Sequence, residues 1–146
     1  MDLNMNFEVI IEQDENIFNA LVSGVRLHNF ANVGSETSKP LSVVCRDDCG
    51  SLIGGITGRT IYRQFLIDAL WVEKSARGTG LGRKLMETAE VAAKARGCLA
   101  AQVDTLSFQA PEFYQKLGFE IIGEVSGVSE SPDRYFLLKR YSQDHA

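Results

Sequence analysis

A glycine-rich loop that opens a helix is the feature that most restricts how this chain can fold. The loop reads Arg77-Gly78-Thr79-Gly80-Leu81-Gly82 and follows an apolar run that ends at Val72. After the loop, apolar residues recur at helical spacing as far as Arg96, and Gly97 supplies a left-handed stop. Glycines leave the backbone open to a ligand, and the first N–H groups of a helix have no partner inside it. Strand, loop and helix together therefore predict a site for an anion.

Two familiar phosphate-binding motifs do not fit this loop. A P-loop ends in Gly-Lys-Ser or Gly-Lys-Thr, but here Arg83 follows Gly82. A dinucleotide fingerprint read from Gly78 and Gly80 requires a small residue at position 83, which is arginine. The spacing that does fit is Gln/Arg-x-x-Gly-x-Gly/Ala, with Arg77, Gly80 and Gly82 at its defined positions.

The rest of the sequence predicts a mixed α/β fold (α+β) around one sheet, in a single domain over residues 1–146 with a short polar tail at 141–146. The expected helices run from the N-cap Asp14 to between Asn29 and Asn32, from Gly80 to Arg96, and from Pro111 to Leu117, with Gly118 as a stop. The expected strands are Phe7 to Ile11, Leu41 to Arg46, Leu52 to Thr60, Phe65 to Val72, Ala100 to Thr105, Phe119 to Gly123 and Tyr135 to Arg140.

Composition argues against several classes of partner. The chain has 15 Lys and Arg against 19 Asp and Glu, and this net charge of −4 argues against nucleic-acid binding. No apolar run reaches the ~18 residues that a membrane span needs, so we expect no membrane insertion. Cys45, Cys49 and Cys98 form neither a paired framework nor a four-ligand zinc set, so we expect a cytoplasmic protein without a metal site.

Two further segments extend the pattern of the loop. Leu70-Trp71-Val72 precedes it, and Ala110-x-x-Phe113-Tyr114-x-Lys116-Leu117-Gly118-Phe119 follows in the last third of the chain. With these segments the sequence resembles the GNAT superfamily of N-acetyltransferases over essentially its whole length. The resemblance implies a central, twisted, mixed but mostly antiparallel sheet of six to seven strands, flanked by three to four helices.

The resemblance also implies a binding site for acetyl-coenzyme A, because the family wraps the cofactor's pyrophosphate in this loop. The residues that it assigns to the cofactor are Leu70, Trp71, Val72, Arg77, Gly78, Thr79, Gly80, Leu81, Gly82 and Arg83. Many relatives also place Asn three residues before the alanine that matches Ala110. Here that residue is Ser107, which either keeps one hydrogen bond to the cofactor or caps the next helix.

The catalytic expectations combine the resemblance with acid–base chemistry. Tyr114 matches the family's tyrosine that protonates the departing thiolate, and the family transfers the acetyl group directly. An alkylammonium has a pKa of ~10.4, so a base must help to remove its proton. Asp68 lies in an otherwise apolar strand and is expected to share a face with Leu66 and Leu70. Asp104 in the next strand is its rival, and ordered water or Glu73 are further alternatives.

We therefore predict an N-acetyltransferase that moves an acetyl group from acetyl-coenzyme A to a primary amine of a small molecule, peptide or protein. The alternative is a non-catalytic module that binds acetyl-coenzyme A or coenzyme A as a sensor or for a partner. The family's fold places the N-terminal helix, the loop from Ala31 to Pro40 and the turn from Ser126 to Asp133 around the acceptor entrance, but these segments carry no recognisable specificity code. A self-pairing sheet edge leaves a homodimer possible.

Overall fold

The computed structural model describes residues 4–109 and 111–142 and divides the chain into two compact units. Unit 1 is Met1–Thr37 and unit 2 is Ser38–Ala146. None of the helices in the described residues is both long enough and apolar enough to cross a bilayer.

The described part of unit 1 contains one helix, α1 (Glu15–Val33), which begins as the sequence predicts. The Asp14 carboxylate accepts hydrogen bonds from the backbone N–H groups of Asn16 and Ile17, at 3.0 and 3.1 Å. The expected strand from Phe7 to Ile11 is wrong, because this segment has no regular secondary structure and both of its end residues are exposed. Alternating apolar residues become a strand only beside a partner strand, and the described part of unit 1 contains none.

Unit 2 contains a six-stranded sheet in the order β1-β2-β3-β4-β6-β5. The strands are β1 (Lys39–Arg46), β2 (Leu52–Ile61), β3 (Gln64–Val72), β4 (Ala100–Leu106), β5 (Glu120–Val125) and β6 (Arg134–Arg140). Strands β3 and β4 pair in parallel and the other neighbours pair antiparallel, which confirms the mixed, mostly antiparallel sheet. The helical elements of this unit are α2 (Leu81–Ala95), α3 (Pro111–Lys116) and the 3₁₀ turns η1 (Lys74–Ala76) and η2 (Ser107–Gln109).

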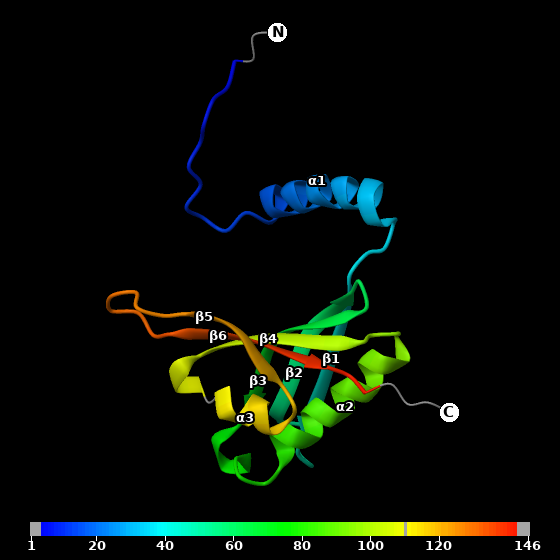
Figure 1. Ribbon diagram of the computed structural model, residues 1–146, viewed down its shortest axis with the longest axis vertical. Coiled ribbons are helices and arrows are strands. Elements are labelled where there is room, and N and C mark those ends of the chain that lie inside the picture. Colours follow the sequence, from blue (N-terminus) through cyan, green and yellow to red (C-terminus); the bar gives the residue numbers. More distant parts are fainter. Residues whose placement is uncertain (1–3, 110, 143–146) are drawn as a thin grey trace. The chain divides into compact units, whose positions relative to one another are not determined.

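Helix α2 covers one face of the sheet, where it packs on β1, β2 and β3 (Figure 1). Its buried side chains recur at helical spacing, and Phe65 of β3 is fully buried in the same core. Gly97 and Gly118 follow α2 and α3 with φ of +89° and +97°, as predicted for helix stops. Tyr141 is buried and its N–H donates to the carbonyl of Leu99 at 2.8 Å, so the predicted polar tail does not begin at 141. Residues 143–146 of that tail lie outside the described chain.

Strand β3 carries a β-bulge at Asp68. Thr57 of β2 is paired with Ala69 and Gly58 with Ile67, so Asp68 is the extra residue between two paired positions. A bulge of one residue reverses the alternation of side chains along a strand. Ile67 therefore faces the core before the bulge and Leu70 faces it afterwards. The expectation that Asp68 shares one face with both Leu66 and Leu70 is wrong for this reason.

Candidate active site

Strands β3 and β4 separate as they approach their C-terminal ends. They pair only where Gln64–Leu66 lie beside Ala100–Gln102. Beyond Leu66, the described residues that pair with β3 all belong to β2, and the bulge bends β3 at this point. The edge of β3 that faces β4 is therefore available to a ligand from Ile67 to Val72.

A cavity of about 710 Å³ lies between this end of β3, the glycine loop, the start of α2 and α3. Nine of the predicted cofactor residues line it together with Tyr114. The full lining is Leu70, Trp71, Val72, Ala76, Arg77, Gly78, Gly80, Leu81, Gly82, Arg83, Phe108, Gln109, Phe113 and Tyr114. Residues as far apart in the sequence as Leu70 and Tyr114 thus meet at one site.

The glycines of the loop serve two different purposes. Gly78 and Gly80 have φ of +79° and +86°, which glycine adopts without strain, and a Cβ on either would enter open space. Gly80 also precedes α2 without offering a side-chain cap, so the first N–H groups of the helix point towards the cavity without a capping partner. A Cβ on Gly82 would instead lie 3.0 Å from the ring of Phe113, so this glycine allows α3 to approach α2. The open N-terminus suits an anion such as a pyrophosphate.

Two arginines add positive charge to this cavity. Arg77 and Arg83 both line it, and Nε of Arg77 donates a hydrogen bond to the carbonyl of Val72 at 3.1 Å. This bond fixes the loop to the end of β3. Thr79 does not line the cavity, and its hydroxyl donates to the carbonyl of Ala76 at 2.5 Å. The hydroxyl of Thr79 therefore stabilises the fold of the loop.

The segment before α3 differs from the sequence prediction. The N–H of Ser107 donates to the carbonyl of Asp133 at 2.8 Å, and Ser107 does not line the cavity. Its neighbours Phe108 and Gln109 line it instead, with Phe108 73% exposed. The sequence signal that could have found them is a large apolar side chain in a polar connection next to the expected contact. Ala110 of the second motif lies outside the described residues.

Tyr114 is buried where the cavity meets the core. Its ring packs edge-to-face against Phe113 and Phe119, with centroid distances of 5.3 and 5.8 Å. Burial raises the pKa of the Tyr114 hydroxyl, and the negative charge of Asp104 raises this pKa further. Tyr114 is consequently a protonated phenol at neutral pH, able to donate a proton within the cavity.

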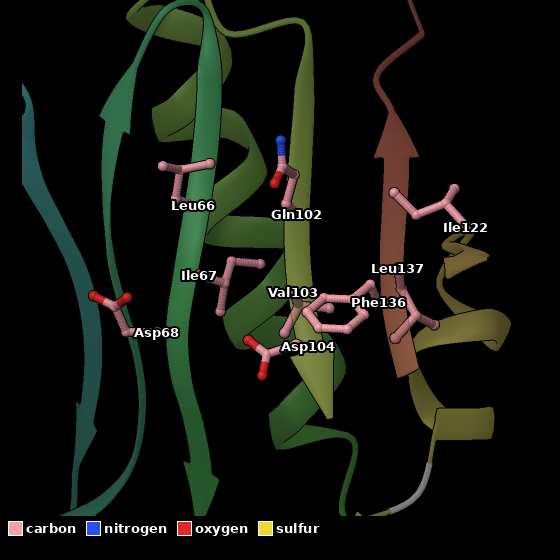
Figure 2. A pocket seen from close by; sticks show the side chains of 9 residues that line it. All are labelled: Leu66, Ile67, Asp68, Gln102, Val103, Asp104, Ile122, Phe136 and Leu137. Carbon is pink, nitrogen blue, oxygen red and sulfur yellow. The ribbon is translucent and has the colours of Figure 1, made fainter. Parts of the chain in front are cut away.

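The two candidate bases border a second cavity, of about 440 Å³, on the sheet face opposite α2 (Figure 2). Figure 2 shows the Asp104 carboxylate directed from β4 towards β3, and Asp68 on the side of β3 that faces away from β4. Asp104 forms an ion pair with Arg134, whereas Asp68 has no hydrogen-bond or ion-pair partner among the described side chains. The carboxylate of Glu73 accepts from the N–H of Ser75 at the start of η1. Asp104 is thus the carboxylate directed into the gap between β3 and β4.

Comparison with known proteins agrees with this geometry. Residues 39–121 match the family model of the acetyltransferase (GNAT) domain. The chain is 31% identical over 137 residues to acetyltransferase Atu2258 of Agrobacterium fabrum, covering 94% of this chain and 100% of the relative. It is 36% identical over 106 residues to blasticidin-S acetyltransferase of Streptomyces morookaense, covering 70% and 78%. The crystal structure of an acetyltransferase from Agrobacterium tumefaciens superposes with a TM-score of 0.87 at 31% identity, covering 94% and 100%.

The fold and the cavity define an acyltransferase, and the chain belongs to the GNAT acetyltransferases. The resemblance drawn from the loop and the second motif is confirmed. Acetyltransferases of this family use acetyl-coenzyme A, which is therefore the acetyl donor of this enzyme.

Proposed function

We propose that this enzyme transfers the acetyl group of acetyl-coenzyme A directly to a primary amine of a small molecule, peptide or protein. The observation that carries the proposal is the 710 Å³ cavity, which is lined by the glycine loop, the unpaired end of β3 and Tyr114. An amine acetyltransferase needs these three features: an anion site, backbone groups for the thioester arm, and a proton donor.

The cofactor's contacts follow from the lining. The first N–H groups of α2, from Leu81 to Arg83, bind the pyrophosphate, and the Arg77 guanidinium adds charge. Backbone groups of β3 from Leu70 to Val72 bind the pantetheine arm as a further strand would, and they polarise the thioester carbonyl. Phe108 offers an apolar contact beside them. Ser107 has less support, because it does not line the cavity.

The reaction makes one C–N bond and breaks one C–S bond. The neutral amine nitrogen attacks the thioester carbonyl carbon, and the coenzyme A sulfur leaves with the bonding electrons. Asp104, directly or through water, takes the proton that the amine loses, while the Tyr114 hydroxyl gives its proton to the leaving sulfur. Because Asp104 is directed into the gap, it is the base that we favour, and Asp68 is the alternative.

The test is turnover with acetyl-coenzyme A and a panel of amines, followed by thiol release and by the mass of the acetylated product. Tyr114→Phe is expected to lower kcat about 10- to 100-fold while the Kd for acetyl-coenzyme A stays nearly constant. Tyr135→Phe, in β6 and outside the cavity, is the matched control and should keep full activity. Thermal stabilisation by coenzyme A without transfer to any amine would instead indicate the non-catalytic module.

Two wider proposals concern the setting of the enzyme. Strand β5 is an edge of the sheet and exposes Ile121 and Val125, which supports a homodimer formed by edge pairing, testable by light scattering. No disulfide joins Cys45, Cys49 and Cys98 in the described residues, which suits a reducing compartment such as the cytoplasm.

A further inference from the structure

An ion pair borders the cavity opposite α2: Asp104 lines this cavity, and Arg134, which is not one of its lining residues, contacts Asp104 from beside it. Asp104 of β4 is paired in register with Phe136 of β6, and Arg134 stands two residues before Phe136. Residues two apart in a strand share a face, so Arg134 and Phe136 lie on the face that carries Asp104. The Arg134 and Asp104 side chains are 46% and 42% exposed. A ligand that contacts Asp104 in this cavity therefore has the partly exposed Arg134 guanidinium directly beside it.

Arg134 retains hydrogen-bonding capacity for a ligand. Only one of its guanidinium nitrogens, Nη1, contacts Asp104, and the described residues offer its side chain no second partner. A guanidinium carries five N–H donors in a planar fork that matches a carboxylate. The remaining donors of Arg134 can accordingly bind a carboxylate while Asp104 stays paired.

An apolar wall stands next to the ion pair. Phe136 and Ile122 line the cavity and are 40% and 59% exposed, although both are large apolar side chains. Exposed apolar side chains beside a few convergent polar groups are typical of a small-molecule site. The wall therefore suits an apolar or aromatic group of the ligand.

These three features discriminate between classes of amine. A polyamine would bring a second cation close to Arg134, and an amine that bears a phosphate would bring two negative charges to a cavity that holds Asp68 and Asp104. We infer that the acceptor is an amine that also carries a carboxylate and an apolar group, as an apolar α-amino acid does. Its amine lies at Asp104, its carboxylate on Arg134 and its side chain against Phe136. The inference rests on the proposed acetyl transfer and names Arg134 as a specificity-determining residue.

The test compares each apolar amino acid with the amine that lacks only its carboxylate. Suitable pairs are phenylalanine with phenethylamine, leucine with isopentylamine, and tryptophan with tryptamine. For the pair that contains the best acceptor, we expect the wild-type enzyme to favour the amino acid about 10- to 100-fold in kcat/KM, the range that one charge-assisted hydrogen bond supplies. The preference should appear mainly in KM.

Arg134→Gln should reduce this preference to within about threefold. Arg140→Gln is the matched control, because Arg140 has the same charge and strand face and lies about 20 Å further along β6. It should leave the preference unchanged. An amino acid and the matching amine also differ in basicity, and this difference affects the wild type and the variants equally. The ratio of the wild-type preference for the amino acid to the preference of each variant therefore removes it.

The inference and the proposed function fail in different ways. Turnover of the simple amines without preference for an amino acid, or a preference that survives Arg134→Gln, overturns the inference alone. Loss of the preference in Arg140→Gln to the same extent overturns it as well. Absence of acetyl-coenzyme A binding in calorimetry overturns the proposed function, and the inference with it.

Discussion

Replacing Gly58 by alanine tests whether the bulge in β3 builds the cofactor site. Gly58 lies in β2 directly opposite the bulge. A Cβ at this position would lie 2.1 Å from the carbonyl oxygen of Leu66 and 3.0 Å from Cα of Ile67. Both neighbours are backbone atoms of a paired strand, so no side-chain rotation can relieve the clash.

The size of the effect follows from these distances. The Leu66 carbonyl must move by about 1 Å to reach an ordinary contact, and overpacking alone costs about 1–3 kcal/mol. Moving the carbonyl also disturbs one or two ladder hydrogen bonds, each worth about 1 kcal/mol. We therefore expect Gly58→Ala to lower the free energy of unfolding by about 3 kcal/mol or more, and Tm by about 6–12 °C.

Urea unfolding and calorimetric binding of acetyl-coenzyme A measure the two consequences. Binding should weaken in Gly58→Ala at temperatures where the protein remains folded, because the displaced strand leads to Leu70–Val72. Gly55→Ala, in the same strand as Gly58, is the control, since its Cβ would lie 3.2 Å from the carbonyl of Val43 in β1, a close contact that a shift of a few tenths of an ångström relieves. A loss of less than about 1 kcal/mol in Gly58→Ala, with unchanged binding, would refute the role of the bulge.

Two further predictions concern the proton donor and the loop. Asp104→Asn removes a negative charge that raises the pKa of Tyr114, so the alkaline limb of the kcat–pH profile should move to lower pH. Asp68→Asn should leave this limb in place. If the alkaline limb is the same in the wild type and both variants, the charge of Asp104 does not set the pKa of Tyr114. Gly80→Ala forces alanine to a φ of +86° and places a methyl group in the cavity, so the Kd for acetyl-coenzyme A should rise about 10-fold or more. Gly97→Ala places alanine at a similar φ at the far end of α2, so it should lower the stability of the protein without changing the Kd for acetyl-coenzyme A. A higher Kd in Gly97→Ala would show that the effect of Gly80→Ala comes from backbone strain in general.

Local sequence patterns predict most of unit 2. Helix α2 and its glycine stop follow from apolar spacing and from the conformation that Gly97 adopts. The β1–β2 turn follows from Asp47, whose carboxylate accepts the N–H groups of Cys49 and Ser51, both at 2.9 Å. Each of these features is decided within a few residues of the chain, which is why the sequence is sufficient to find it.

The errors arise where contacts between distant residues decide the structure. Leu66, Asp68 and Leu70 resemble an unbroken alternation, whereas the bulge lies opposite Gly58 of another strand, whose missing side chain leaves room for the Leu66 carbonyl. Pairing of Asp104 with Arg134 depends on the register of β4 and β6, which no local pattern contains. Nine of the residues predicted to bind the cofactor nevertheless line one cavity, because the loop and the end of β3 are nearly contiguous in sequence.

The short parallel ladder between β3 and β4 has a consequence for the dynamics of the enzyme. Three paired positions are the whole β3–β4 ladder in the described residues, so the sheet consists of two halves, β1–β2–β3 and β4–β6–β5, joined along a narrow seam. Acetyl-coenzyme A bound in the gap would contact both halves and hold them together. Amide hydrogens of Ile67 to Val72 that face the gap should exchange rapidly with solvent in the ligand-free protein and slowly once the cofactor is bound. Substrate binding and mechanical cohesion of the sheet would then depend on the same few backbone groups.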